Sequence, residues 1–376
     1  MGLMSGTSLD GIDAALVEIE GAGLDTKVNL LAFNTYEIPL ETKKRIKIAC
    51  LDQNSSTALI CSLNFELGKL FSDAVGKILR QGQITAEVLD FVASHGQTIY
   101  HLPEGSDLYL PSTLQIGEPS IIAYEHGVQV ISNFRTMDLA AGGAGAPLVP
   151  YSEYILYGGR GENIALQNIG GIGNVTLIPA EKDIRKIFAF DTGPGNMMID
   201  EACQQLFGLA YDANGDIAKK GKVIESLFEA LKNHPYLALK PPKTTGREVF
   251  GQQFVDQLLV QYAAEKPEDV VCTLTYYTAY SIAQSYKDFV FNQMPIHKVI
   301  VGGGGAHNQF LMETLQGLIG DIPVYSQDDL GYSADAKEAI AFVILGNETL
   351  HGNPSNVMTA TGAKASVVLG NITPAP

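Results

Sequence analysis

The architecture follows from the stretch Gly2-Leu3-Met4-Ser5-Gly6-Thr7-Ser8-Leu9-Asp10-Gly11-Ile12-Asp13. The apolar run that ends at Met4 predicts one strand, and residues 14–18 predict a second. The small and hydroxyl-bearing residues between them predict a tight hairpin whose tip can wrap phosphate groups. An ordinary hairpin turn is an equally good interpretation of this segment taken alone.

Three further glycine-rich segments follow apolar runs: residues 167–176, Phe190-Asp191-Thr192-Gly193-Pro194-Gly195-Asn196 and Val301-Gly302-Gly303-Gly304-Gly305-Ala306-His307-Asn308. The first again predicts strand, turn and strand. The last leads into an amphipathic segment, so its glycines lie at a helix N-terminus, where adenosine or phosphate can rest against the backbone. This combination is typical of phosphotransferases with actin-like domains. We therefore expect an α/β, two-domain actin-like (ribonuclease H-like) ATPase fold with a central cleft.

The length of 376 residues favours two domains over one core. We expect an N-terminal actin-like domain over residues 1–140, with a C-terminal segment packing back on it. A second actin-like domain is expected over residues 141–376, with ATP and sugar in the cleft between the two. The Gly/Ala-rich residues 140–147 are interpreted as the connection.

Composition limits the partners. The net charge of −16 argues against nucleic-acid binding, although backbone amides can still hold ATP. The four cysteines lack CxxC spacing and are interpreted as reduced, packed thiols. Neither a secretory signal nor a membrane-spanning run is recognisable. We expect a cytoplasmic protein without a membrane partner.

Apolar runs and helical periodicity alternate along the chain, as layered α/β folds require. The predicted strands are 88–93, 128–131, 164–169, 187–190 and 299–301, and the predicted helices are 57–79, 197–207, 254–264 and 273–290. The tail 371–376 is expected to fray.

Asp191 is the best candidate for a reacting carboxylate. It ends the apolar strand Ile187-Phe188-Ala189-Phe190 and precedes Thr192-Gly193-Pro194-Gly195, which opens a helix. Ligands bind at strand ends in α/β folds, and apolar neighbours can raise the basicity of a carboxylate there. The alternative is a helix N-cap. The Gly-Pro-Gly sequence makes plain capping the weaker interpretation, because it permits close backbone approach.

Other polar residues are secondary candidates. Gln97 and Thr98 follow a predicted strand in Ser94-His95-Gly96-Gln97-Thr98 and can face a polar ligand. Arg135 can form a bidentate pair with a carboxylate or phosphate of a ligand, or it can pair with Asp138 in a turn. Residues 243–250 form either a mobile flap or a surface loop. Glu338 lies three residues after Asp335, so a capping pair is the simplest interpretation of it. No His/Cys/Asp cluster has the spacing of a protein-caged transition metal.

With these residues, the chain resembles the anhydro-N-acetylmuramic acid kinases of the acetate and sugar kinase, Hsp70 and actin superfamily. The resemblance covers nearly the full length, and its most specific motifs are residues 4–13 and 190–196. It also includes residues 94–98, 140–150, 168–171, 245–248, 302–308 and 361–363.

The resemblance implies the reaction. Water attacks C1 of 1,6-anhydro-N-acetylmuramic acid, the anhydro bridge opens, and O6 receives the γ-phosphoryl group of ATP. The product is N-acetylmuramic acid 6-phosphate, formed in cell-wall recycling. Asp191 matches the general base. ATP and Mg²⁺ are implied because phosphoryl transfer needs charge neutralisation, and the family is usually homodimeric.

The implied site residues fall into two further groups. The ATP-binding group is Gly6, Thr7, Ser8, Leu9, Asp10, Gly11, Ile12, Asp13, Asn168, Gly170, Gly171, Gly302, Gly303, Gly304, Gly305 and Asn308. The substrate-binding group is Gln97, Thr98, Arg135, Gly193, Pro194, Gly195, Asn196 and Glu338. The metal ligands are not implied.

This chain departs from the family pattern near Arg135. It has Asn133 where the family reads Asp before Phe-Arg, Ala144 where Gln is frequent, and Met137 where a polar residue is common. A rival hypothesis is a kinase for 1,6-anhydroglucose, which lacks the lactyl and acetamido groups. Another is an Hsp70-like or actin-like ATPase that needs no sugar.

Overall fold

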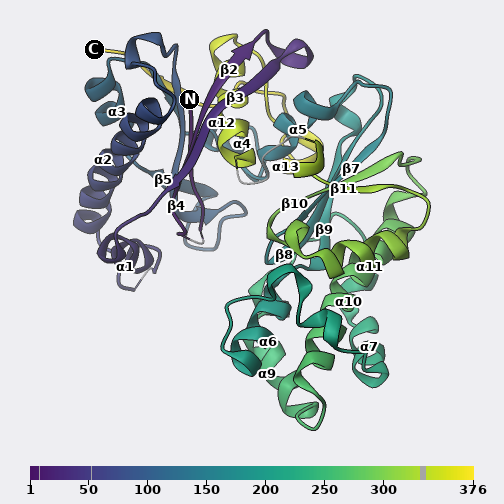
Figure 1. Cartoon of the computed structure of the whole chain (residues 1–376). Coiled ribbons are helices and arrows are strands. Elements are labelled where there is room, and N and C mark those ends of the chain that lie inside the picture. The colour runs from purple at the N-terminus through teal and green to yellow at the C-terminus, as the bar shows by residue number, and fades with distance from the viewer. Residues whose placement is uncertain (8, 52, 331–335) are drawn as a thin grey trace. The chain divides into compact units, whose positions relative to one another are not determined.

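The computed structural model describes residues 1–7, 9–51, 53–330 and 336–376. The chain forms two compact units (Figure 1). The first contains Met1–Tyr157, Asp183–Lys186 and Asp335–Pro376, and the second contains Gly158–Lys182 and Ile187–Ala334. The first unit extends beyond residue 140 because helix α5 (Val149–Tyr157) packs against α12 (Lys337–Leu350).

The first unit is built on a seven-stranded sheet of order β12-β6-β4-β1-β2-β3, with β5 paired to β4. Strands β1, β2 and β3 form an antiparallel meander, whereas β4 is parallel to β1 and β6 is parallel to β4. The strands are β1 (Gly2–Ser5), β2 (Ile12–Glu20), β3 (Lys27–Tyr36), β4 (Val92–Leu102), β5 (Ser112–Ile116), β6 (Val130–Ser132) and β12 (Asn371–Thr373).

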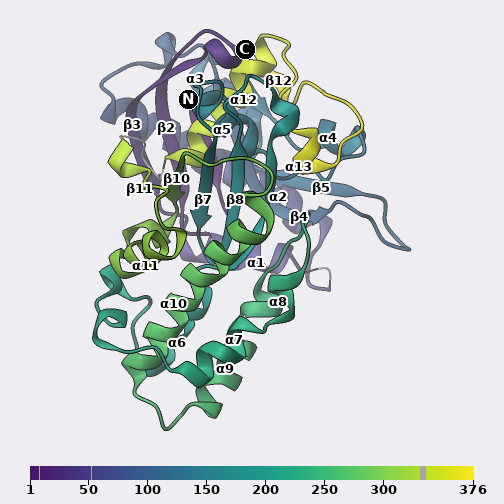
Figure 2. The same ribbon diagram turned by 90° about the vertical axis from the view of Figure 1, so that its right-hand side faces the viewer.

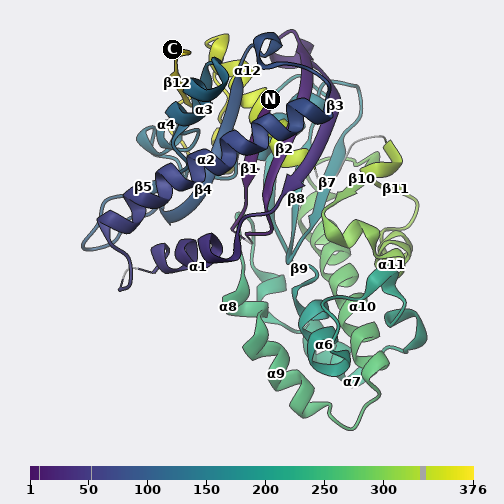
Figure 3. The same ribbon diagram turned by 60° about the vertical axis from the view of Figure 1, so that its left-hand side comes forward.

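Helices cover both faces of this sheet. Helix α2 (Thr57–Gln81) packs on β2 and β3 through an apolar stripe that includes Leu63, Leu67 and Phe71 (Figure 3). Helix α12 packs on β1, β2 and β4, so the C-terminal segment lies beside the first strands. The remaining helices are α1 (Leu40–Ala49), α3 (Pro119–His126), α4 (Thr136–Ala140) and α13 (Met358–Thr361).

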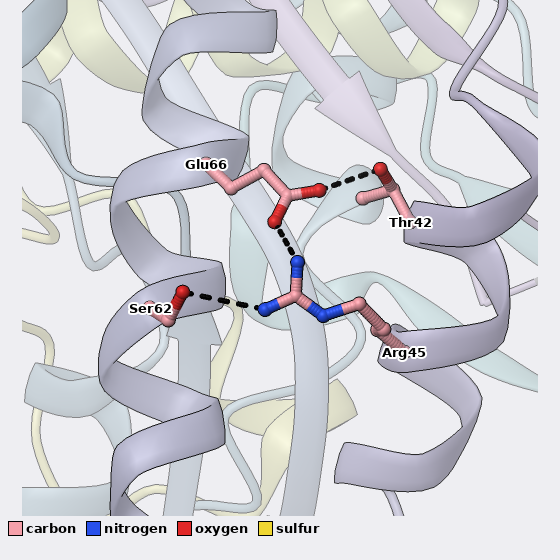
Figure 4. Close-up of polar contacts among 4 residues, drawn as sticks. All are labelled: Thr42, Arg45, Ser62 and Glu66. Atoms are coloured by element: carbon pink, nitrogen blue, oxygen red, sulfur yellow. Dashed lines mark hydrogen bonds and ion pairs between the residues drawn. The ribbon is translucent and has the colours of Figure 1, made fainter.

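Helix α1 is fastened to α2 by polar contacts around Glu66 (Figure 4). The Glu66 carboxylate accepts a hydrogen bond from Thr42 Oγ1 at 2.6 Å and forms an ion pair with Arg45. Arg45 Nη2 also donates to Ser62 Oγ at 3.3 Å. From the same helix, Lys43 Nζ donates to the carbonyl of Asp10 at 3.3 Å, so α1 also supports the predicted phosphate-binding loop.

The second unit repeats the topology of the first. Its sheet has the order β11-β10-β7-β8-β9, in which β7, β8 and β9 form an antiparallel meander and β10 and β11 are parallel additions. The strands are β7 (Ile164–Ile169), β8 (Ile172–Ile178), β9 (Phe188–Pro194), β10 (Lys298–Gly302) and β11 (Val324–Ser326). A meander followed by parallel strands in both units confirms the predicted actin-like, ribonuclease H-like architecture.

The helices of the second unit gather on one side of its strands (Figure 2). Helix α10 packs on β9, α6 and α11, and its buried face includes Tyr277 and Ile282. The helices of this unit are α6 (Met197–Phe207), α7 (Glu225–Lys232), α8 (Arg247–Phe250), α9 (Gln252–Gln261), α10 (Pro267–Ser285) and α11 (Gln309–Ile319). A π-helical turn, η7 (Tyr286–Val290), follows α10. No helix in the described part of the chain is long and apolar enough to cross a membrane.

Several predicted elements differ from the structure. The strand predicted at 88–93 begins only at Val92, because Val88 is 62% exposed and ends a 3₁₀ turn. The tail expected to fray contains β12, which pairs with β6. Residues 140–147 are not the connection between units but part of the first. The buried Asp138 carboxylate holds them in place by accepting the amide of Gly145 at 2.8 Å.

Candidate active site

Asp191 lies on β9 and is held mainly by one distant segment. Its backbone amide donates to the carbonyl of Lys243 at 3.1 Å, and its carbonyl accepts from the Tyr236 hydroxyl at 2.8 Å. Its Oδ2 accepts from the amide of Thr245 at 2.9 Å. Burial raises the pKa of Asp191, against the opposing effects of the Thr245 amide and the Lys243 charge. This is the environment of a carboxylate that can accept a proton.

Thr245, whose backbone amide binds this carboxylate, received no site role from the sequence. Its Oγ1 is buried, and within the described residues it has no hydrogen-bond partner. Buried hydroxyls are normally bonded. This unpaired hydroxyl belongs to the same residue whose amide fixes the Asp191 carboxylate.

Glycine turns of the second unit meet beside β7. A Cβ on Gly195 would lie 2.2 Å from the carbonyl oxygen of Gly170, so only glycine permits this approach. Gly303 has φ +80, and a Cβ there would lie 2.8 Å from Ile169 O. The structure thus brings together the predicted residues of the 168–171, 193–196 and 302–305 turns. Asn308 caps α11 by accepting the amide of Leu311 at 3.0 Å.

A pocket of about 420 Å³ opens beside these turns within the second unit. It is lined by Asn196, Ile199, Asp200, Tyr211, Asp212, Asn214, Gly304, His307 and Asn308. Burial alone raises the pKa of the Asp200 carboxyl to about 6. Asp200 carries no sequence signal of its own, because it is one of several polar residues on an amphipathic helix.

In the first unit, Gln97 holds the predicted phosphate-binding loop. Its Oε1 accepts from Ser5 Oγ at 2.7 Å, and its Nε2 donates to the carbonyl of Gly6 at 3.3 Å. Its side chain is 1% exposed, and both of these hydrogen bonds support the loop. Thr98 is half-buried and accepts from Gln115 Nε2 at 3.2 Å. Of the loop itself, Ser8 lies outside the described residues.

Arg135 is held by His95. Arg135 Nε donates to His95 Nε2 at 3.0 Å, so His95 Nδ1 carries the proton and donates to the Gly96 carbonyl. Burial and the Arg135 charge lower the pKa of His95 to about 3, so the ring stays neutral. Arg135 Nη1 donates to the carbonyl of Gly145 at 2.8 Å. The alternative Arg135–Asp138 turn pair is not formed, because Asp138 accepts from Asn356 and Thr361.

Glu338 faces the Arg135 charge from the second position of α12. Burial raises the pKa of Glu338, as does the nearby Asp13 carboxylate, whereas the charges of Lys337 and Arg135 lower it. Asp13 also accepts from Thr35 Oγ1 at 2.6 Å. The structure therefore groups the predicted residues Asp13, Arg135 and Glu338. Asp335, with which Glu338 was expected to cap the helix, lies outside the described residues.

A family model for anhydro-N-acetylmuramic acid kinase matches residues 1–375. The chain belongs to the anhydro-N-acetylmuramic acid kinase family. It is 54% identical over 376 residues to the anhydro-N-acetylmuramic acid kinase of Clostridioides difficile, covering 100% of this chain and 98% of that protein. It is also 54% identical over 374 residues to the Bacillus cereus protein of the same name, covering 99% and 98%.

The chain is less similar to solved structures than to these relatives. The activator of the 2-hydroxyisocaproyl-CoA dehydratase from Clostridium difficile with bound ADPNP matches with a TM-score of 0.45 and 12% identity, over 91% of this chain and 92% of that one. A ROK family protein from Streptococcus pneumoniae in complex with sucrose has a TM-score of 0.38 and 12% identity, with coverages of 93% and 98%. Membership of the anhydro-N-acetylmuramic acid kinase family rests on the sequence match.

The departures from the family pattern have different surroundings. Asn133 has φ +58, a left-handed conformation that Asn tolerates better than most residues, and it lines a pocket of about 340 Å³ in the first unit. Met137 is 46% exposed. Ala144 donates its backbone amide to Thr361 O at 2.8 Å, a contact that most side chains permit.

Proposed function

We propose that this chain is an ATP-dependent kinase that hydrolytically opens 1,6-anhydro-N-acetylmuramic acid and phosphorylates O6. The observation that carries the proposal is the family match over residues 1–375. The half-buried Asp191, with one carboxylate oxygen fixed by the Thr245 amide, supports it. The product would be N-acetylmuramic acid 6-phosphate, and the setting cytoplasmic cell-wall recycling by a homodimer.

In the proposed step, Asp191 accepts a proton from water as the water oxygen bonds to C1 of the sugar. The C1–O6 bond breaks, O6 bonds to the γ-phosphorus, and ADP leaves. We propose that the Thr245 hydroxyl holds this water in line with the carboxylate. Its buried, unpaired Oγ1 supports that role.

For ATP, we propose contacts from residues 6–13 and from the glycine turns at 168–171 and 302–305. Residues 193–196 are proposed to bind the sugar. The pocket beside Gly304 would take the nucleoside, with Asp200 accepting from one of its donors. Arg135 and Glu338 would bind the sugar.

Mg²⁺ would neutralise charge between the β- and γ-phosphates. Among the described residues there is no group of three ligating side chains. Mg²⁺ usually takes only one or two carboxylates together with phosphate and water oxygens, so the single Asp13 carboxylate of the predicted phosphate-binding segment fits it.

The test is incubation of the purified protein with ATP and each of two anhydrosugars in ¹⁸O-water, followed by mass analysis. The expected product is phosphorylated anhydro-N-acetylmuramic acid with one added water, whose label lies at C1 and not in the phosphate. Turnover of 1,6-anhydroglucose alone would favour the rival kinase. Labelled phosphate without a sugar product would indicate a simple ATPase and refute the proposal.

A further inference from the structure

Lys243 is a buried cation to which the proposed reaction assigns no role. Its side chain is 6% exposed. Its Nζ lies 4.7 Å from the ring centroid of Tyr236, 4.8 Å from that of Phe289 and 5.9 Å from that of Phe190. It also donates at 3.4 Å to the carbonyls of Tyr236 and Leu237. The ammonium group thus lies in an aromatic cage closed by backbone oxygens.

Burial makes a charged ammonium group unfavourable in this cage. Burial lowers the pKa of Lys243 to about 8, against the opposing effects of the Asp288 and Asp191 charges. An uncharged methionine could fill an aromatic cage without the loss of hydration that an ammonium group suffers. The cage alone therefore does not explain why the residue carries a charge.

The neighbour that gains from the charge is Asp191. Burial favours the neutral form of the Asp191 carboxyl, and the Lys243 charge works against this. The same residue also positions Asp191 through its backbone, because the Lys243 carbonyl accepts the Asp191 amide at 3.1 Å. Two residues further on, the Thr245 amide binds the Asp191 carboxylate.

We propose that Lys243 is a positioning residue for Asp191. Its charge favours the ionised form of the carboxylate, which burial disfavours. Its caged side chain also anchors the segment that carries the Thr245 amide. This inference rests on the proposed function, in which Asp191 must be ionised to accept a proton from water.

The other titratable and charged groups around Lys243 do not supply this effect. The Asp288 carboxylate is negative, so it favours the charged form of Lys243 and cannot favour a second carboxylate. Burial and the Asp191 charge raise the pKa of the Tyr236 hydroxyl, so it stays neutral. Among the groups that couple to Asp191 in the described chain, Lys243 is therefore the cation.

The test compares the pH dependence of kcat/KM for the anhydrosugar in the wild-type chain, Lys243→Met and Lys243→Arg. Loss of the charge should move the acid limb of the Met variant about one pH unit toward alkaline pH. The loss of activity would be about tenfold well below the limb and would vanish on the alkaline plateau. Lys243→Arg should keep the wild-type limb, because it keeps the charge. Lys243→Gln, which can still donate to the carbonyls, replaces the Met variant if that variant does not fold.

A merely structural role would lower kcat/KM by the same factor at every pH, and that result would overturn the inference. So would a Met or Gln variant with an unshifted acid limb. An Arg variant with the same shifted limb as Met would show that charge is not the cause. Absence of sugar turnover by the wild-type chain at every pH would instead refute the proposed function, and this inference with it.

Discussion

The carboxylate of Asp191 accepts a hydrogen bond from the backbone amide of Thr245, 54 positions later in the chain, at 2.9 Å. This bond fixes one carboxylate oxygen. The other, Oδ1, accepts no hydrogen bond from the described residues. A carboxylate held in this way has a defined direction for its remaining lone pairs, which a general base needs.

Asp191→Asn should abolish this basicity while it preserves the shape of the side chain. We expect sugar-dependent turnover to fall by about a hundredfold or more, the usual scale for a lost general base. ATP binding, measured by calorimetry, should change little. The exposed carboxylate variant Glu265→Gln is the control and should keep wild-type turnover. Near-normal turnover in folded Asp191→Asn would remove Asp191 from this role.

Thr245→Val and Thr245→Ser form a matched pair for the unpaired hydroxyl. Valine keeps the shape of threonine and the backbone amide but loses Oγ1, whereas serine keeps the hydroxyl. We expect Val to lower kcat by about tenfold or more, the range in which a lost hydrogen bond to a reacting group falls. Ser should remain within a few-fold of the wild-type chain. Equal kcat values for Val and Ser would show that the hydroxyl does not hold the water.

The local parts of this structure could be predicted because they depend on neighbouring residues. Strand β7 and helix α6 have the predicted bounds, since apolar periodicity and the flanking glycines define them. Strand β3 was missed because it lies at a sheet edge, where a continuous buried face is not required. Its alternation of exposed and half-buried residues gives a weak signal.

The site could be predicted only in part, because several of its contacts join residues that are distant in the sequence. Asp191 stands out because it follows an apolar run and precedes Thr-Gly-Pro-Gly. The prediction that it ends the strand is wrong, because β9 continues through it to Pro194. Lys243 and Thr245 reach it through backbone atoms, which carry no information in the side-chain sequence. Likewise, Gln97 sits in a motif that suggests ligand contact, yet its amide is used by Ser5 and Gly6. Only a fold that pairs β1 with β4 makes that contact visible.

Asp138 should be a major stabilising residue of the first unit. Its carboxylate is fully buried and accepts from Asn356 Nδ2 and Thr361 Oγ1 at 2.9 Å each and from the Gly145 amide at 2.8 Å. Asp138→Ala leaves these donors unpaired, so we expect the free energy of unfolding to fall by about 3 kcal/mol. Urea denaturation measures this change. Asp73→Asn, at an exposed position of α2, is the control and should cost less than about 0.5 kcal/mol.

The Asp200 carboxylate should lower the free energy of unfolding at neutral pH. This half-buried group has a pKa raised to about 6 from the ordinary value of 3.8. The folded state therefore binds this proton more tightly than the unfolded state does. Its stability falls as the pH rises from about 4 to about 6. Asp200→Asn removes this penalty. After a discount for partial exposure, we expect a gain of about 1 kcal/mol at pH 8 and no gain at pH 4.

The same variant should weaken nucleotide binding if the Asp200 carboxylate accepts from the nucleoside. We expect the Kd for ATP, measured by calorimetry at pH 8, to rise by about tenfold, because a hydrogen bond to a charged acceptor is lost. The exposed variant Glu265→Gln should alter neither stability nor Kd. A gain in stability with an unchanged Kd would show that Asp200 is desolvated without contacting ATP. An unchanged stability at pH 8 would contradict the raised pKa itself.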